Sequence, residues 1–295
     1  VVSPMDFLPS IEHNALIVDL GDWVLKTALK QMREWRGAGN DIKVSVNIAA
    51  LQLQRKDFVS SLQALLKEYA DIPAANLELE ILETAALHDI EQVSSIMKQC
   101  DAMGVNFALD DFGTGYSSLT YLKRLPAKVL KIDRSFIIDL LDDPDDIAIT
   151  EGILGLTQAF HRIPIAEGVE SIQHGRLLLS LGCQLAQGYG IARPMPGQDL
   201  PGWIEKFVVA EEWRDIGVQR LNYEDNTLLL LAVEHHRMVS QVLRAVEQSA
   251  ASLLPENPQD AHICNLGHWL DNEGHEKFGD MALFSANDGK TSSVT

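Results

Sequence analysis

Cysteine is scarce in this sequence. Cys100, Cys183 and Cys264 are odd in number, lie far apart and form no Cys-x-x-Cys pair. A disulfide framework is therefore not expected, and this usage favours a reducing compartment, so we predict that the chain is cytoplasmic. Long apolar runs are also missing. The densest, residues 228–233, is far below the roughly 20 residues that a bilayer requires, so no membrane segment is expected in this chain.

Positive charge is also in short supply. The sequence has 24 Lys and Arg residues against 42 Asp and Glu, which gives a formal net charge of −18. A protein that follows the phosphates of a long nucleic acid needs clustered cations, and no such run occurs here. Polymeric nucleic acid is therefore not expected as a partner. A small anion remains compatible with this charge if bound metal ions reverse it locally.

What the sequence does contain, up to about residue 210, is an alternation of helical and β-rich segments. Helical periodicity occurs at residues 15–35, 58–69, 90–103 and 147–160, and β-rich runs occur at residues 42–48, 77–82, 105–109, 129–132, 163–166 and 184–186. This alternation indicates βαβ units and a mostly parallel sheet. Long helical periodicity then takes over. We therefore predict two parts, a barrel at 1–212 and a helical segment at 213–295.

Each β-rich run ends in polar residues. These are Asn47; Glu80 and Glu83; Asp110 and Asp111; Lys131 and Asp133; Glu167 and Glu170; and Gln187. In a (β/α)8 barrel all strand carboxyl ends meet around one mouth, whereas a doubly wound sheet binds ligands only near one switch point. We therefore predict an α/β fold of the TIM-like (β/α)8 type. Only six strands are visible where about eight are needed, so the first is expected to lie before Val1.

The segment from Asp110 to Leu119, Asp-Asp-Phe-Gly-Thr-Gly-Tyr-Ser-Ser-Leu, is the most specific. Successive strand residues face opposite ways, so both aspartates can line one site only if the strand ends there. Gly113 and Gly115 would supply that turn. Two adjacent carboxylates can then serve divalent ions. The alternative is an aspartate that caps a helix beside a flexible loop.

Two further pairs of charged residues allow more than one interpretation. Glu78 and Glu80 share one face of their run, which indicates either a buried, paired carboxylate or an edge strand with a solvated acidic face. Lys131 and Asp133 also share a face, as expected for an interior ion pair or for a cation that stabilises phosphate charge. Taken alone, the ion pair is the favoured interpretation of the second pair.

The chemistry of this set of residues favours a hydrolase. Its oxygen-rich groups suit Mg²⁺ or Mn²⁺ rather than zinc, because this half of the chain has no Cys/His cluster. Two such ions activate a water and stabilise the transition state of phosphoryl transfer, so phosphodiester hydrolysis is the predicted reaction class. A metal-dependent aldolase-like barrel is an alternative, but it leaves the Asp-Asp-Phe-Gly loop unexplained.

The order and spacing of these motifs resemble the EAL domain over roughly residues 1 to 210. The motifs are Ser45-Val-Asn47, Glu80-Ile-Leu-Glu83, the Asp110–Leu119 segment, Leu130-Lys-Ile-Asp133, Ala166-Glu-Gly-Val-Glu170 and Gln187-Gly-Tyr189. The resemblance implies a modified TIM barrel that hydrolyses cyclic di-GMP to linear pGpG with two Mg²⁺ or Mn²⁺ ions. It also implies a homodimer formed through the loop after Asp111.

The resemblance also assigns roles to individual residues. The implied metal ligands are Asn47, Glu80, Asp110, Asp111 and Glu167. Lys131 is expected to orient the attacking water, and with Asp111 and Glu167 it makes up the implied catalytic set. Gln187, Glu170 and Asp133 are expected to support the site or the substrate, and Glu83 to anchor the loop after Asp111.

The chain departs from the family pattern at its start. The Glu-Ala-Leu tripeptide, which supplies another metal ligand in the family, is absent from the sequence. The arginine that follows it is absent too. We expect them upstream of Val1, and we expect this chain by itself to be poorly active. The alternative function is a catalytically silent cyclic di-GMP receptor that acts through partner contacts. Retention of Asn47, Asp110, Asp111, Lys131 and Glu167 favours the enzyme, because a receptor needs contacts to phosphate and guanine but not a full metal set.

The C-terminal part resembles a second family. His235-His-Arg-Met238 and Cys264-Asn-Leu-Gly-His-Trp269 are similar to motifs of the chemoreceptor zinc-binding (CZB) domain, a small helical bundle. The resemblance implies Zn²⁺ ligation by His235 and Cys264. The family's final His-x-x-x-His pair has no counterpart here, and a structural zinc ion needs four ligands. The alternative is a connector helix followed by a polar tail.

Overall fold

The computed structural model describes residues 3–87, 89–115 and 119–214, and its sheet is parallel throughout. The strands are β1 (Val44–Asn47), β2 (Leu77–Leu82), β3 (Asn106–Phe112), β4 (Val129–Ile132), β5 (Ile163–Glu167) and β6 (Ala186–Gln187). The helices are α1 (Pro4–Ile11), α2 (Leu16–Gly37), α3 (Ala50–Leu53), α4 (Phe58–Glu68), α5 (Glu83–Leu87), α6 (Ile90–Ala102), α7 (Leu119–Arg124), α8 (Ser135–Ile138), α9 (Pro144–Ala159), α10 (Ile172–Ser180), α11 (Leu200–Lys206) and α12 (Glu211–Arg214).

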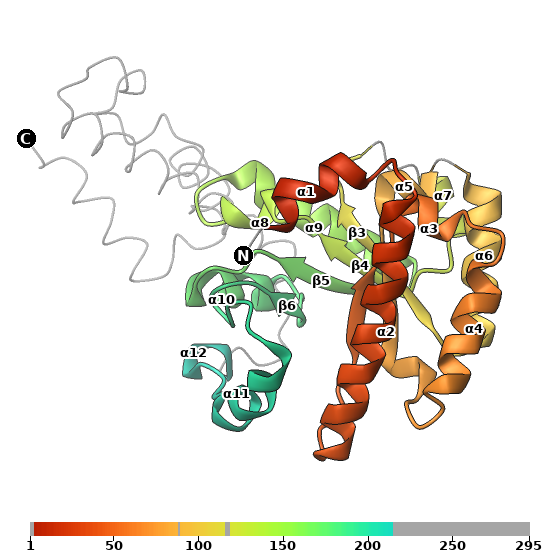
Figure 1. The fold of residues 1–295 in the computed structure, drawn as a ribbon. Coiled ribbons are helices and arrows are strands. Elements are labelled where there is room, and N and C mark those ends of the chain that lie inside the picture. The colour runs from red at the N-terminus through yellow and green to blue at the C-terminus, as the bar shows by residue number, and fades with distance from the viewer. Residues whose placement is uncertain (1–2, 88, 116–118, 215–295) are drawn as a thin grey trace, which may run out of the picture.

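The order of the strands distinguishes a barrel from a doubly wound sheet. The six strands follow one another as β1-β2-β3-β4-β5-β6, and every pair is parallel. Each strand therefore lies beside the next one in the sequence, with no switch point within the described residues. Helices α2, α4 and α6 lie toward the β1 end, and α9 and α10 toward the β6 end (Figure 1). The result is a half-barrel sheet of the kind a TIM-like barrel contains.

The expected elements agree closely with the observed ones. Residues 58–69 and 90–103 were expected to be helical and contain α4 and α6, and residues 77–82 and 129–132 coincide with β2 and β4. The main difference is in β3, which was expected to end at Leu109 but continues to Phe112. The expected segment 213–295, with His235 and Cys264, lies outside the described residues except for the end of α12.

Local sequence fixes where several helices begin. The side chain of Asp89 accepts a hydrogen bond from the Gln92 N–H at the start of α6, which satisfies a backbone donor left free in the first turn. Ser171 does the same for the N–H of His174 at the start of α10. These caps stop the helices from extending back into the turns that follow the strands, so the strand ends stay free for other contacts.

The core lies between the sheet and its helices, and β2 and β4 run through it. All four residues of β4 are buried, as are the first five of β2. Most of these are apolar, but Glu78, Glu80 and Lys131 are also buried. A buried charge is costly unless it is paired, so these three side chains must have partners within the fold. The alternative of a solvated edge strand for Glu78 and Glu80 is therefore wrong.

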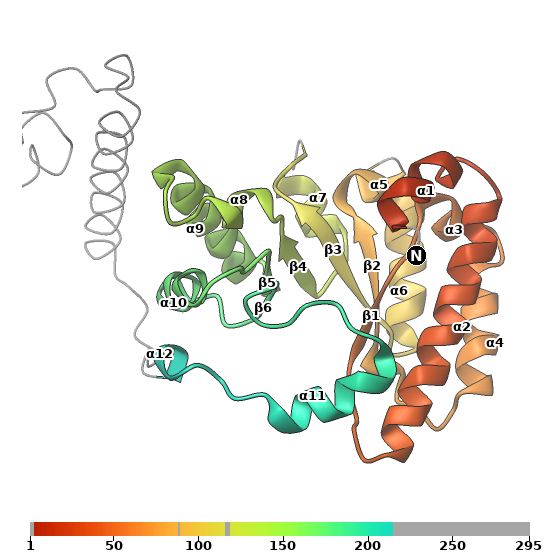
Figure 2. The ribbon, with the colours of Figure 1, turned by 60° about the vertical axis from the view of Figure 1, so that its left-hand side comes forward.

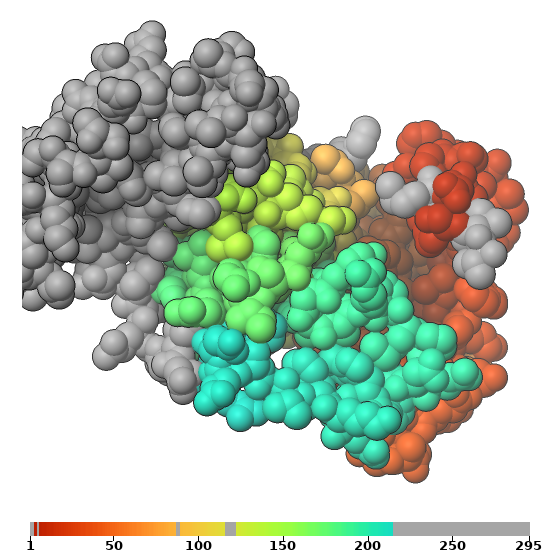
Figure 3. All heavy atoms as spheres, turned by 90° about the vertical axis from the view of Figure 1, so that its left-hand side faces the viewer, coloured from red at the N-terminus to blue at the C-terminus, as the bar shows by residue number. Residues whose placement is uncertain are grey.

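The chain after β6 crosses to the other edge of the sheet. The indole of Trp35 on α2 donates a hydrogen bond of 2.8 Å to the carbonyl of Gly197. Figure 2 shows this segment running from β6 to α2, and Figure 3 shows it covering the face between them. It thus links the two edges of the sheet. Within the described residues, no helix combines the length and apolar character needed to cross a membrane.

Candidate metal site

The paired aspartates lie in an irregular part of β3. The register between β3 and β4 shifts between Leu109 and Phe112, and Asp111 has a φ of 52°. A positive φ is uncommon for a residue with a Cβ and often marks a functional site. The strand is therefore irregular at the two aspartates, so they need not face opposite ways as successive residues of a regular strand do. As expected, the strand ends close to the aspartates, at Phe112, and Gly113 follows it in a turn with a φ of 102°.

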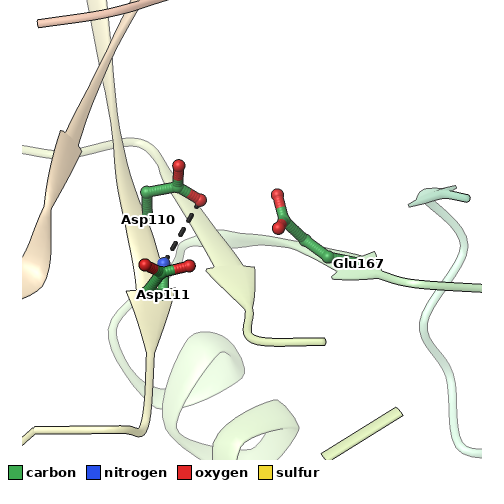
Figure 4. A group of neighbouring side chains, drawn as sticks. All are labelled: Asp110, Asp111 and Glu167. Carbon is green, nitrogen blue, oxygen red and sulfur yellow. Dashed lines mark hydrogen bonds between the residues drawn. The ribbon is translucent and has the colours of Figure 1, made fainter. Parts of the chain in front are cut away.

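Three carboxylates converge at the carboxyl ends of β3 and β5. Asp110, Asp111 and Glu167 each offer an oxygen atom, and these atoms all lie within 4.8 Å of one another. Figure 4 shows Glu167 reaching from β5 toward the two aspartates on β3. The Asp111 N–H also donates a hydrogen bond of 3.2 Å to the Asp110 carboxylate, which holds that side chain in place. We call these three residues the carboxylate cluster.

Lys131 lies among these acids, in the middle of the sheet. Its ammonium is 2.9 Å from a carboxylate oxygen of Glu80, 2.9 Å from Asp110 and 2.5 Å from Glu167. These partners come from β2, β3 and β5, on both sides of β4. The favoured interpretation of a pair with Asp133 was wrong, because Asp133 instead accepts hydrogen bonds from the backbone and hydroxyl of Ser135.

One lysine does not balance the negative charge at this end of the barrel. Burial raises the pKa of Glu167 to about 7, and burial together with the nearby Asp110 carboxylate raises the pKa of Asp111 to about 6. Burial also raises the pKa of Glu80. Burial alone would lower the pKa of Lys131, but its carboxylate partners raise it, so this side chain remains an ammonium. The site therefore has room for a further positive charge.

The chemistry of the donors matches a hard divalent cation. All three members of the cluster offer carboxylate oxygens, which Mg²⁺ and Mn²⁺ prefer, and Asp110 is already buried where water cannot fully solvate its charge. A bound cation would offset the repulsion that raises the pKa of Asp111. The residues present therefore fit a divalent metal ion.

The other predicted site residues differ in how directly they contact the cluster. The amide of Gln187 donates a hydrogen bond of 2.7 Å to Glu167, so it holds a member of the cluster directly. Glu83 accepts a hydrogen bond of 3.1 Å from the Gly113 N–H, at the start of the loop after Asp111. Asn47 is exposed at the end of β1 and aligns with Glu80 on β2.

Glu170 is not drawn into the cluster. Its carboxylate forms an ion pair of 2.8 Å with Arg134, and both side chains are substantially exposed. The stem of Arg134 also lies against Gly168, where a Cβ would approach it to 2.4 Å. Sequence reasoning missed Arg134 because an exposed arginine after a strand carries no distinctive signal. Its position directly after Asp133 was the only available clue.

A parallel sheet in barrel order, with clustered carboxylates and a buried lysine at its carboxyl edge, defines a TIM-barrel-like α/β protein with an acidic cluster that could hold a metal ion. The chain belongs to the EAL domain family, whose model matches residues 1–194. The expected family is thereby confirmed for this part of the chain.

Comparison with individual proteins gives the same result. The bifunctional diguanylate cyclase/cyclic di-GMP phosphodiesterase MucR of Pseudomonas aeruginosa is 44% identical over 201 residues, which are 68% of this chain and 29% of MucR. The cyclic di-GMP phosphodiesterase NbdA of the same organism is 40% identical over 208 residues, 70% of this chain and 26% of NbdA.

A solved structure also resembles the chain. The complex of PaMucR phosphodiesterase with c-di-GMP has a TM-score of 0.65 and 44% identity, and the alignment covers 68% of this chain and 81% of that one. The chain thus spans less than a third of the length of the two curated relatives, while it spans most of the solved domain.

Proposed function

We propose that this chain carries a phosphodiesterase domain that hydrolyses cyclic di-GMP to linear pGpG in bacterial second-messenger signalling. The observation that carries the proposal is the carboxylate cluster of Asp110, Asp111 and Glu167 beside the buried Lys131, at the carboxyl ends of the strands. The names of MucR and NbdA support the substrate. In the reaction, water adds to one phosphorus, one phosphodiester P–O bond breaks, and the leaving ribose oxygen takes up a proton.

The proposed ligands of two Mg²⁺ or Mn²⁺ ions are the carboxylate cluster together with Glu80 and Asn47. When bound, such ions polarise the phosphate and lower the pKa of a coordinated water. Glu167 is held for this task by Gln187, and the loop after Asp111 is held by Glu83. We assign Asp133 a supporting role at the site, because its carboxyl group is hydrogen-bonded to that of Asp111 and, after burial and Asp110, helps to raise the pKa of Asp111.

Lys131 has a distinct part in this arrangement. Its raised pKa keeps it protonated, so it serves as a hydrogen-bond donor and positive charge rather than as a base. Its contacts with Glu80, Asp110 and Glu167 fix the ammonium at the strand ends, where it can orient a water or a phosphate oxygen. A preorganised charge of this kind needs no rearrangement during the reaction.

The test is hydrolysis by the intact protein. Cyclic di-GMP is incubated with Mg²⁺ or Mn²⁺, and the products are separated by chromatography. We expect pGpG to appear with either ion and to disappear after chelation. Binding of cyclic di-GMP without pGpG at any metal concentration would instead establish the receptor alternative. The D111N variant serves as the control, because it should still bind the ligand but hydrolyse it about 10²-fold or more slowly.

We further propose that the domain acts as a cytoplasmic homodimer that meets its partner through the loop after Asp111. The family resemblance and the anchoring of this loop by Glu83 support that surface. For residues 213–295 we propose a CZB-like helical segment in which His235 and Cys264 take part in Zn²⁺ binding, supported by their motifs. Zinc titration of the intact protein, with metal content and hydrolysis rate both measured, tests this assignment.

A further inference from the structure

A surface cavity of about 880 Å³ lies far from the carboxylate cluster and is unusually basic for this protein. It is lined by Ile90, Glu91, Ser94, Ser95, Lys98, Lys123, Arg124, Leu125, Pro126 and Arg162. Four of these side chains are cationic and one is acidic, although the chain as a whole has a net charge of −18. The fold therefore brings several cations together at this cavity, although the protein as a whole is acidic.

The cavity opens at the opposite end of the sheet from the carboxylate cluster. Pro126 lies just before β4, and Arg162 lies immediately before β5, so the cavity is at the amino ends of these strands. Glu167, in contrast, is the last residue of β5. A ligand in this cavity would therefore not compete with one bound at the carboxyl ends.

The walls of the cavity are held together by hydrogen bonds between separate elements. The Ser94 hydroxyl on α6 donates 2.9 Å to the carbonyl of Arg124 at the end of α7. The guanidinium of Arg162 donates to the carbonyls of Leu122 and Leu125, at 3.3 Å and 3.0 Å. Arg162 thus ties the start of β5 to α7 and to the residue that follows α7, and the cavity has a defined frame.

The remaining three cations project from this frame without acidic partners. Lys98, Lys123 and Arg124 are exposed, and none of them forms an ion pair within the part of the chain that the structure describes. By contrast Lys128, the next lysine after this group, pairs with Asp101 at 2.9 Å. Unpaired cations that converge on one hollow are suited to multidentate, charge-assisted contacts with an anion.

We propose that this cavity binds a small oligophosphate, either inorganic or carried by a nucleotide. The volume lies in the range of small-molecule sites, and cations from α6 and α7 border the same hollow. A phosphate chain offers several negative oxygens within the reach of two lysines and an arginine, which a single carboxylate does not. The proposal does not depend on the hydrolytic activity.

The first test is isothermal titration calorimetry with inorganic pyrophosphate in resin-treated buffer free of divalent cations. Without such cations the carboxylate cluster repels anions, so the heat reports binding elsewhere. We expect saturable binding that weakens about tenfold or more in K98Q/K123Q, because two charged donors are lost. The matched control is K30Q/K67Q, which removes the same charge from exposed positions on α2 and α4 and should change the affinity by about twofold at most.

Parallel titrations define the ligand. Binding of ATP as well as pyrophosphate would assign the site to nucleotides, and binding of pyrophosphate alone would assign it to inorganic oligophosphate. Equal affinity in the wild type and K98Q/K123Q would overturn the proposal, as would the absence of binding at millimolar pyrophosphate. It would also be overturned if D111N abolished pyrophosphate binding, because the ligand would then lie at the carboxylate cluster. Hydrolysis of cyclic di-GMP by K98Q/K123Q should remain at the wild-type rate.

Discussion

Strand β2 carries two buried glutamates on one face, and their surroundings differ. Glu78, toward the amino end, accepts hydrogen bonds from Lys43 at 2.7 Å and from the Ser45 hydroxyl at 2.9 Å. Glu80, two residues on, shares the buried Lys131 with acids from β3 and β5. The Glu78 carboxylate is thus neutralised by one lysine and hydrogen-bonded by one hydroxyl. Around Glu80, in contrast, the single Lys131 ammonium contacts three carboxylates.

This difference separates a structural pair from a functional one. The Lys43 side chain is 46% exposed, so solvent screens its charge, whereas that of Lys131 is only 5% exposed. Stability alone would favour balanced charges at both ends of the barrel. The excess of carboxylates at the Lys131 end is understandable if a cation from solution completes it, and the four predictions that follow test this difference.

The largest effect is expected from Lys131→Met. Removing the ammonium leaves the buried Glu80 and Asp110 and the partly buried Glu167 without their common partner, which typically costs about 3–5 kcal/mol in the free energy of unfolding. Urea denaturation measures this loss, and Mg²⁺ should restore part of it. The matched Lys43→Met variant should lose less, because the Lys43 side chain is about half-exposed and solvent already screens its charge. Equal losses of unfolding free energy in the two variants would show that Lys131 is no more important to stability than Lys43, and would contradict the prediction.

The second prediction concerns Asp111→Asn. Loss of this proposed metal ligand should lower the rate of cyclic di-GMP hydrolysis by about 10²-fold or more, with little change in the urea midpoint when Mg²⁺ is present. The comparison variant, Glu78→Gln, should do the reverse and reduce stability more than turnover, because Glu78 faces Lys43 rather than the cluster. Full activity in Asp111→Asn would show that the metal lies elsewhere.

The third prediction is a pH dependence in the absence of divalent ions. In the folded protein, burial raises the pKa of Asp111 to about 6 and that of Glu167 to about 7, above their unfolded values near 4. The folded state then binds more protons than the unfolded state, so the free energy of unfolding increases as pH falls from about 7 toward 4. Above the folded pKa values the penalty is fully present.

Thermal melts at pH 8 and pH 6 check this sign. The wild type should gain a few degrees more than D111N/E167Q on acidification, since about 1 kcal/mol corresponds to roughly 2–4 °C in a domain of this size. The variant controls for the general relief of negative charge. Identical shifts in the two proteins would contradict the prediction, and saturating Mg²⁺ should diminish the difference between them.

The smallest effect is expected from Ser45→Ala, because Ser45 interacts with both Glu78 and Glu80. Its hydroxyl donates to Glu78 and also lowers the pKa of Glu80, although burial dominates there. Losing one hydrogen bond should cost about 1 kcal/mol by urea denaturation and change turnover by less than threefold. A large loss of turnover would place Ser45 in the catalytic arrangement. A Ser45→Thr variant, which keeps the hydroxyl, is the control.

The sequence determined the alternation of strands and helices and the polar residue that follows each strand. These follow from local periodicity, and Asp110, Glu167 and Gln187 could be assigned to one site because the carboxyl ends of parallel strands lie along one edge. The predicted limits of β2 and β4 were right for the same reason: each is an uninterrupted run between turn residues.

Other features were decided only by the tertiary structure. Asp111 has a positive φ at the place where the register between β3 and β4 shifts. Local sequence does not encode such a shift. The partners of Lys131 come from three strands, so its pairing could not be inferred from the neighbouring Asp133. The basic cavity brings together Lys98, Lys123 and Arg162, which span 64 residues of sequence. The net charge of the chain gives no sign of such a local cluster of cations. Long-range packing sets where each charge lies, because pairing energies depend on distances in space rather than along the chain.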